Sequence, residues 1–198
     1  MIRSAILALI FASAACASPQ PAVPSPWAAS DPAWVEPFDP FAIADGVYFI
    51  GTRGLSSFLI ATDEGHFLID GGLPENAEGI AKNIEALGFS LRDVKYLLNS
   101  HAHFDHSGGL AALKTKTGAR LVASEGDRSA LESGFYLGSE DDENLNAPPV
   151  AVDRTIADGE ALILGGALYA GVSARFLDGG VIPDDLHPLL PKALTFTF

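Results

Sequence analysis

The stretch from residue 100 to residue 109 constrains the fold more than any other part of the chain. It reads SHAHFDHSGG and holds three of the five histidines together with one aspartate. Imidazole and carboxylate groups bind divalent metals, and the spacing of His101, His103, Asp105 and His106 lets one short loop present all four. Side chains two apart in an extended segment project to the same side, so His101 and His103 can meet one ion. Asp105 and His106 then turn toward a neighbouring point, which predicts a site for one or two metal ions.

Zinc suits such a set of nitrogen and oxygen donors. A partly protein-ligated zinc lowers the pKa of its bound water to about 7, which makes hydroxide available at neutral pH. Asp105 can ligate one ion and orient that hydroxide, so it is the candidate catalytic residue. The alternative interpretation is that the histidines are surface or capping residues, and four potential ligands at this spacing argue against it.

The segments before this stretch change from strand to helix patterns. Three apolar segments, separated by Gly, Asp and Glu, predict strands joined as hairpins: VYFIGT, SFLIAT and HFLID. Residues 73–88 then have helical spacing, with Ile80 and Ile84 on one face, Pro74 in the first turn and Gly88 at the end. The sequence therefore predicts an antiparallel start followed by an amphipathic helix.

The histidine stretch itself lies between a predicted strand and a predicted helix. VKYLLNS, which ends at residue 100, predicts a short apolar strand, and LAALKTKTG predicts a helix with Ser107 as its cap and Gly118 as its end. RLVAS predicts the next strand, and Ser124 with Asp127 resembles a capping box that opens a short helix. This order indicates an α+β fold with a mixed sheet and a helical layer. Ligands of such sheets bind outside the carboxyl ends of the strands, where His101 lies.

Composition limits the kinds of partner. The chain has 198 residues, 48% of them hydrophobic, and a formal net charge of −13, which fit one globular domain. The negative charge repels phosphate backbones and anionic lipid headgroups, so neither nucleic acid nor a membrane surface is expected to bind, and a small-molecule substrate is favoured. No stable protein partner is indicated. Cys16 is the only cysteine, and it lies in the N-terminal segment that we expect to be a leader for export. A metal site of the exported domain must therefore use nitrogen and oxygen ligands.

The N-terminus predicts export. Residues 1–17 combine a basic Arg3, a short apolar run and small residues, which is typical of a secretory signal peptide and predicts a periplasmic location. Lipidation of Cys16, which would attach the protein to a membrane, is the alternative to simple cleavage. Residues 18–36 are rich in Pro, Ala and Ser and predict a linker, and 37–198 are expected to form the domain.

The same residues carry a family resemblance. H-x-H-x-D-H from His101 to His106 resembles the metal motif of the metallo-β-lactamase fold superfamily, whose members are αββα zinc hydrolases. The flanks resemble subclass B3 metallo-β-lactamases from about Phe38 to about Ala170, in these segments: GLSSFLI, GHFLIDGGLPENA, DVKYLLNSHAHFDHSGGLAAL, TGARLVAS and APPVAVDRTIADGEALILGG. The resemblance implies a periplasmic enzyme of antibiotic resistance that opens β-lactam rings through metal-bound hydroxide.

The resemblance also implies residue roles. His101 and His103 would hold a first zinc, Asp105 and His106 a second, and Asp70 in LIDGG would support the site from below. A carboxylate before two glycines at a strand end is also ordinary turn chemistry, which is the alternative for Asp70. His66 is expected to be structural. The acidic run SEDDEN, residues 139–144, is expected to be a solvated loop.

The tail departs from the family pattern. A segment resembling TPGHTPG, which would supply a further zinc ligand, is expected after Ala170, but the chain reads GVSARFLDGGVIPDDLHPLLPKALTFTF. His187 is the only later histidine, and we expect it to be a tail residue. The sequence thus predicts an incomplete αββα domain, with its N-terminal half present, its C-terminal half largely missing and an atypical tail at 171–198. Two alternatives to an active β-lactamase follow: an inert relative that binds zinc weakly, or another hydrolase of this fold acting on a thioester, lactone or phosphodiester.

Overall fold

A seven-stranded sheet forms the centre of the computed structural model, which describes residues 26–170. The strands lie side by side in chain order. Those before the first long helix pair antiparallel, and those from β4 onward pair parallel. The strands of this sheet are β1 (Phe41–Ala44), β2 (Val47–Phe49), β3 (Phe58–Thr62), β4 (Gly65–Ile69), β5 (Val94–Leu98), β6 (Arg120–Ser124) and β7 (Arg154–Ile156).

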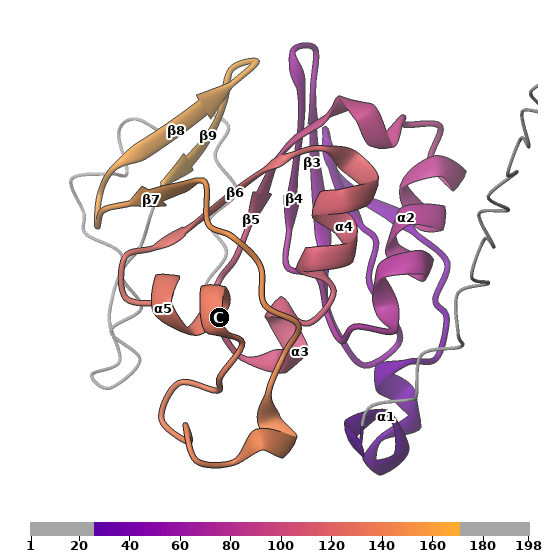
Figure 1. The fold of residues 1–198 in the computed structure, drawn as a ribbon. Helices are drawn as coiled ribbons and strands as arrows, with labels where there is room; N and C mark the ends of the chain where they lie inside the picture. The colour runs from indigo at the N-terminus through magenta and orange to yellow at the C-terminus, as the bar shows by residue number, and fades with distance from the viewer. Residues whose placement is uncertain (1–25, 171–198) are drawn as a thin grey trace, which may run out of the picture.

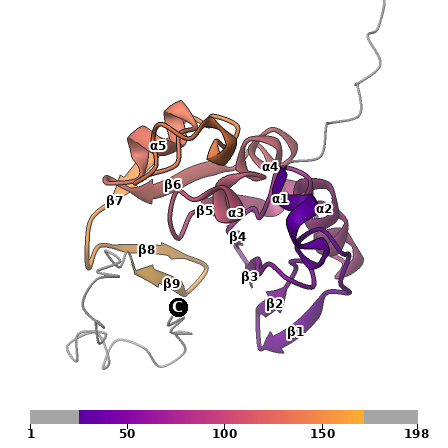
Figure 2. The same cartoon turned by 90° about the horizontal axis from the view of Figure 1, so that it is seen from below.

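Helices cover one face of this sheet, and a separate hairpin lies on the other (Figures 1 and 2). The hairpin consists of β8 (Ala161–Leu164) and β9 (Ala167–Ala170). The α-helices are α1 (Pro26–Ser30), α2 (Asn76–Ala86), α3 (Phe104–Ser107), α4 (Leu110–Thr117) and α5 (Arg128–Ser133). Three short 3₁₀ helices join them: η1 (Pro32–Trp34), η2 (Leu91–Asp93) and η3 (Glu143–Leu145). The described residues therefore form a helical layer, a seven-stranded mixed sheet and a second, two-stranded sheet.

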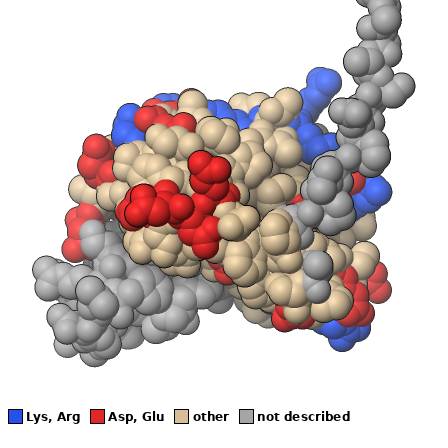
Figure 3. Space-filling view, turned by 60° about the horizontal axis from the view of Figure 1, so that its bottom comes forward, with Lys and Arg blue, Asp and Glu red and all other residues tan. Residues whose placement is uncertain are grey.

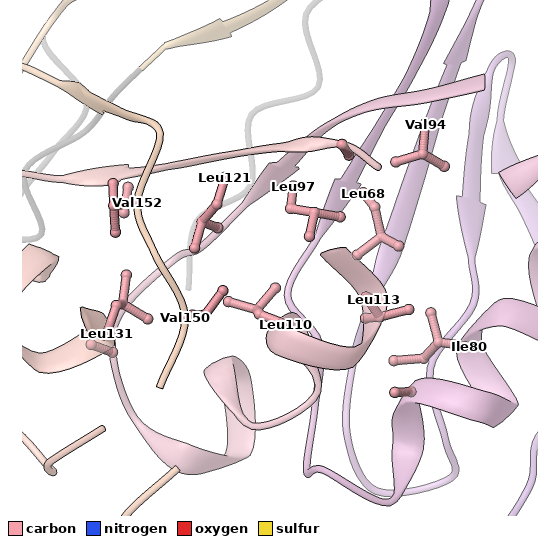
Figure 4. Close-up of a cluster of buried hydrophobic side chains, with 14 of the residues drawn as sticks. Leu68, Ile80, Val94, Leu97, Leu110, Leu113, Leu121, Leu131, Val150 and Val152 are labelled. Atoms are coloured by element: carbon pink, nitrogen blue, oxygen red, sulfur yellow. The ribbon is translucent and has the colours of Figure 1, made fainter. Parts of the chain in front are cut away.

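The main core lies between the sheet and the helices (Figure 4). Leu68, Leu97 and Leu121 come from three adjacent strands, and each is fully buried. They pack in one cluster with Ile80 of α2 and Leu113 of α4. The helical spacing of α2 gives it a single apolar face, so burying that face against the sheet fixes where α2 lies.

The opposite face of the sheet is apolar as well. Phe67, Leu98 and Val122 alternate with the residues of the first cluster along their strands and form a second buried cluster. Leu162 of β8 and Ile156 of β7 complete this cluster. A sheet that is buried on both faces has strands without a polar side, which is why HFLI and LL appear as continuous apolar runs.

Most of the predicted elements are present, but two predicted helix caps are wrong. Gly118 ends α4 in the left-handed conformation at φ 71°, as a helix-ending glycine should. Ser107 does not cap α4, because the N-cap is Gly109 and the Ser107 hydroxyl instead donates to the carbonyl of His103. Ser124 does not cap α5 either, because the N-cap is Asp127, but the Ser124 hydroxyl accepts from the amide of Asp127, 3.1 Å away, in the turn ahead of α5.

The predicted linker is partly folded. Of residues 18–36, the described part forms α1 and η1, and backbone bonds join it to the β2–β3 loop, including Gly54 N to Ala33 O at 2.8 Å. The predicted signal peptide, Cys16, the tail 171–198 and His187 all lie outside the described residues. Within 26–170, no helix is both long and apolar enough to span a bilayer.

Leu97→Ala should reveal how much the main core contributes. Leu97 is fully buried in the main cluster, and truncation leaves a cavity, so we expect a loss of about 2–5 kcal/mol in the free energy of unfolding. Urea denaturation followed by circular dichroism measures it. Ile163→Ala is the control, because Ile163 is 65% exposed, and it should change stability by about 0.5 kcal/mol or less. Equal losses in both variants would contradict this assignment of the core.

Candidate metal centre

The site is built where two neighbouring parallel strands end. Ile69 of β4 is in register with Leu98 of β5, so the residues that follow each strand meet at one edge of the sheet. Asp70 follows β4 directly, and the histidine stretch follows β5. The chain then turns into α3, whose first residue, Phe104, comes directly after His103. This juxtaposition is a consequence of parallel pairing, which places carboxyl ends together.

The structure brings all four predicted metal ligands together. His101, His103 and Asp105 each offer a ligand atom, and these atoms lie within 4.8 Å of one another. His106 adjoins this group, because its Nε2 is 3.5 Å from Asp105 Oδ2 and its ring centroid is 4.0 Å from that of His101. All four side chains are partly exposed, so an ion could reach them from solvent.

Asp70 is a buried carboxylate that contacts the loop carrying the histidines. It is 2% exposed and has a left-handed backbone with φ 60°, which an aspartate tolerates better than most residues. Its carboxylate accepts from the Ser100 amide at 2.8 Å and from the Ser100 hydroxyl at 2.7 Å. It also lies 2.8 Å from His106 Nδ1. With Nδ1–H donated to Asp70, Nε2 of His106 is left facing Asp105, as a metal-ligating histidine requires.

A second buried carboxylate holds the same loop from the other side. Asp127 is 8% exposed, and its Oδ1 accepts from the amide of Ala102 at 3.2 Å, between the two histidines of the H-x-H pair. Its Oδ2 accepts from the Ser124 hydroxyl at 2.8 Å. The sequence suggested Asp127 only as a helix cap, and the S-x-x-D pattern gave no sign of the contact with Ala102.

Glycines let the backbone that follows β4 approach the backbone around α3 closely. Gly71 donates its amide to the carbonyl of His106 at 2.7 Å, and Gly109 donates to the carbonyl of Gly72 at 3.1 Å. A Cβ on Gly109 would collide with the backbone oxygen of Gly71. The glycines of LIDGG and HSGG are therefore needed for close backbone approach beneath the metal ligands.

The surroundings of the site shift the pKa values of two of its imidazoles in opposite directions. Burial lowers the pKa of His101, and the neighbouring His106 and His103 lower it further. Burial also acts against the charge of His106, but the hydrogen bond to Asp70 and the charges of Asp70 and Asp105 outweigh it and raise the pKa of His106. His101 therefore presents the unprotonated ring that a metal ion needs.

The sequence alone did not point to two further residues at the site, Tyr136 and Trp27. The Tyr136 hydroxyl is 2.9 Å from His103 Nδ1, and burial, with Asp105, raises the pKa of this phenol. Trp27 of α1 stacks on Phe104 with ring centroids 4.7 Å apart. Both contacts join segments distant in the chain, so no local pattern predicts them.

His66 and the acidic run of residues 139–144 lie outside the ligand group. His66 is 7% exposed, its ring meets Phe89 edge-on at 4.9 Å, and its Nδ1 accepts from the Thr62 amide at 3.4 Å. The acidic run is solvent-exposed from Glu140 to Asn144. On the face seen in Figure 3, acidic side chains gather near the centre and basic ones lie toward the margins.

A family model and several solved structures are similar to this chain. The family model described as "Metallo-beta-lactamase superfamily" matches residues 50–181. A metallo-β-lactamase of Cronobacter sakazakii is similar in structure, with a TM-score of 0.69 and 45% identity over 71% of this chain and 54% of that chain. BJP-1, a subclass B3 metallo-β-lactamase of Bradyrhizobium japonicum, has a TM-score of 0.68 and 42% identity, covering 71% of this chain and 53% of that one.

A relative with a different activity is similar over a shorter region. The hydroxyacylglutathione hydrolase of Pelagibacter ubique is 36% identical over 78 residues, which is 37% of this chain and 31% of the relative. The chain thus spans about half the length of the similar solved structures and about a third of this relative.

The chain belongs to the metallo-β-lactamase superfamily, whose members are hydrolases. This confirms the predicted family, its resemblance to subclass B3 and the α+β class of the fold. The fold implies binding of a divalent metal, and His101, His103 and Asp105 form a group that could hold one.

Asp70→Asn should lower the pKa of His106 in the metal-free protein. The substitution removes the adjacent negative charge that favours the protonated ring. Because the folded-state pKa of His106 is raised, its protonation stabilises the fold below the ordinary histidine pKa of about 6.5, and this contribution is lost as the pH rises through the folded-state value. NMR titration of the imidazole protons measures the shift. Asp39→Asn, at an exposed position, is the control, and an unchanged His106 pKa in Asp70→Asn would contradict the assignment.

Proposed function

We propose that this chain is a zinc hydrolase whose site is built to open β-lactam rings. The observation that carries the proposal is the convergence of His101, His103 and Asp105, whose ligand atoms lie within 4.8 Å of one another at the carboxyl end of β5. A catalytic zinc is typically held by three protein ligands of this kind and keeps one open position. The described residues therefore place three such donors together, with His106 beside them.

The surroundings of the ligands fit a metal. Burial keeps the pKa of His101 low, so its ring is unprotonated at neutral pH. Asp70 fixes one nitrogen of His106 and so sets the direction of the other, an arrangement common to metal-binding histidines. His101 and His103 are assigned to hold the first ion and Asp105 and His106 to hold a second, with Asp70 supporting His106.

Different residues of the chain have different roles in the proposed hydrolysis. A bound zinc supplies Lewis acidity, which polarises a carbonyl and makes water more acidic. Asp105 has two carboxylate oxygens, so one can ligate while the other accepts a proton or orients the attacking water. Ser100 and Asp70 hold the loop rigid through hydrogen bonds of 2.7 and 2.8 Å, which keeps the ligands in place during turnover.

The sequence identity to known proteins supports a β-lactam as the substrate class. Identity to the two metallo-β-lactamases is 45% and 42% over 71% of the chain, and identity to the hydroxyacylglutathione hydrolase is 36% over 37% of the chain. The longer and stronger likeness supports a β-lactam. Hydrolysis of a thioester, lactone or phosphodiester is the second candidate, which the hydrolase relative favours.

The predicted signal peptide supports the location. An enzyme acting on β-lactams is useful where those compounds reach their targets, and residues 1–17 have the pattern of an exported leader. We therefore propose a periplasmic protein of antibiotic resistance, with lipidation at Cys16 as the alternative to a cleaved leader.

The purified chain should bind zinc, and His103→Ala should weaken binding by more than about tenfold, because it removes one of three converging donors. Competition with a chromophoric chelator gives the dissociation constant. His187→Ala is the control, since the sequence predicts a tail residue there, and it should leave zinc affinity within about twofold. If both variants bind as the parent does, the ligand assignment is wrong.

The chain should hydrolyse a chromogenic cephalosporin slowly. With His101 and His103 assigned to one ion and Asp105 and His106 to a second, each ion has two of the three protein ligands that a catalytic zinc typically needs. A metal held by two ligands is poorly oriented, and misplacement of a reacting group by about 1 Å costs roughly a hundredfold in rate. We therefore expect a kcat/KM about a hundredfold or more below that of purified BJP-1, and its loss with chelator or in Asp105→Ala.

A hydroxyacylglutathione thioester assayed in parallel tests the second candidate. Faster zinc-dependent cleavage of the thioester than of the cephalosporin would overturn the β-lactam assignment. Zinc binding without turnover of either compound would favour the inert relative.

A further inference from the structure

Asp127 contacts the histidine loop although it follows a different strand. β6 pairs parallel with β5, so the segments after both strands leave the sheet at the same edge. Asp127 lies shortly after the end of β6 and directly before α5. Its Oδ1 accepts from the amide of Ala102 at 3.2 Å. Ala102 is the residue between His101 and His103, so this bond acts on the backbone that separates two predicted metal ligands.

The place of Asp127 in the chain predicts a different contact from the one observed. An aspartate at the N-cap of a helix normally accepts from the amides of the first helical turn. Asp127 is the N-cap of α5, yet its side chain makes no capping hydrogen bond. Its two oxygens accept instead from the Ala102 amide and from the Ser124 hydroxyl, the latter 2.8 Å away. The carboxylate therefore binds the histidine loop rather than the helix that it precedes.

The contact between Asp127 and Ala102 is buried. Asp127 is 8% exposed and Ala102 is 4% exposed. A buried carboxylate is costly unless donors satisfy it, and a hydrogen bond to a charged acceptor is stronger than one between neutral groups. Ser124 restrains Asp127 further, because its hydroxyl also accepts from the Asp127 amide at 3.1 Å. The bond to Ala102 is therefore made by an acceptor that is itself held in place.

This bond restrains the two histidines relative to each other. The Ala102 amide belongs to the peptide group that joins His101 to Ala102, so holding it limits the backbone rotations between His101 and His103. The ligand atoms that these histidines and Asp105 offer lie within 4.8 Å of one another. Ligands that are already in place when an ion arrives lose less conformational freedom on binding.

We propose that Asp127 is a positioning residue that sets the spacing of the metal ligands His101 and His103. The proposal rests on the proposed function, in which both histidines bind the metal. Partners outside the ligand set typically account for about 10–100-fold in metal affinity. Asp127 acts through the backbone amide of Ala102, so its effect belongs at the lower end of that range.

Zinc affinity of three Asp127 variants tests this role. Asp127→Ala removes the acceptor of the Ala102 amide, so we expect the zinc dissociation constant to rise about tenfold. Asp127→Asn keeps a carbonyl oxygen that can accept from Ala102, and it should bind zinc within about threefold of the parent. Asp127→Ser can still cap α5, but its hydroxyl is too short to reach Ala102, so it should bind zinc as weakly as Asp127→Ala.

Asp153→Ala is the matched control. Asp153 also holds a backbone amide of β6, that of Leu121 at 2.7 Å, but at the opposite end of the strand from Asp127. Its loss should lower stability and leave zinc affinity within about twofold of the parent, because distant sites are nearly independent. Thermal unfolding of each metal-free variant separates loss of stability from loss of affinity.

Hydrogen exchange in the metal-free protein gives a readout that does not depend on zinc. The Ala102 amide loses its acceptor in Asp127→Ala and Asp127→Ser, so NMR should show it exchanging about tenfold faster than in the parent. The amide of Leu97 in β5 should keep the parent's rate, because the change is local. Asp127→Asn should keep the Ala102 amide protected.

Several results would overturn the proposal. One is zinc affinity in Asp127→Ala within about twofold of the parent. Equal losses in Asp127→Ala and Asp127→Asn would assign the effect to the charge and not to the hydrogen bond. Recovery of zinc affinity in Asp127→Ser would assign it to the cap of α5. Equally faster exchange at Ala102 and Leu97 would assign it to general stability.

The two kinds of measurement distinguish this proposal from the proposed function. Faster exchange at Ala102 in Asp127→Ala, with a parent protein that fails to bind zinc, would refute the metal assignment and leave the restraint of the loop established. Zinc binding by the parent, with unchanged Ala102 exchange in Asp127→Ala, would refute the positioning role alone.

Discussion

The buried carboxylate of Asp70 is the interaction on which the site depends. It is 2% exposed, and it holds Ser100 through both amide and hydroxyl and His106 through Nδ1. An uncompensated buried carboxylate is costly, so these donors must stay in place while the protein is folded. The end of β4, the loop after β5 and helix α3 are thereby joined at one point, and the ligands move as a unit with the sheet.

Asp127 performs the same task from the other side of the loop. Its contact with the amide of Ala102 sets the backbone between His101 and His103, and Ser124 at the end of β6 holds it in turn. Asp70 and Asp127 therefore reach the loop from the strands that flank β5 on either side. A loop held at both edges can keep converging ligands in place without a bound ion, which agrees with the group formed by His101, His103 and Asp105.

The chemistry of the site follows from this rigidity together with the family. The chain belongs to the metallo-β-lactamase superfamily, and the close backbone approach of Gly71 and Gly109 explains why the sequence around the ligands is glycine-rich. Asp105 lies within reach of both His101 and His103 on one side and of His106 on the other, so its carboxylate can serve either ion. The proposed zinc hydrolase uses this shared carboxylate as its catalytic group.

The amino-acid sequence alone determined the parts of the molecule that depend on local spacing. The four ligands are close in the chain, so their convergence needs one turn only. Helix α2 follows from an apolar period of 3.6 residues, and the central strands follow from short apolar runs bounded by turn residues. It also indicated Asp70, through resemblance to the family. What only the tertiary structure decided are contacts between distant segments: Asp127 with Ala102, Tyr136 with His103 and Trp27 with Phe104. These depend on how parallel strands and helices pack, and a contact across tens of residues leaves no periodic signal in a single sequence. The error at Ser107 has a local cause instead: its hydroxyl donates to the carbonyl of His103, the N-cap of α3, and Gly109 is the N-cap of α4.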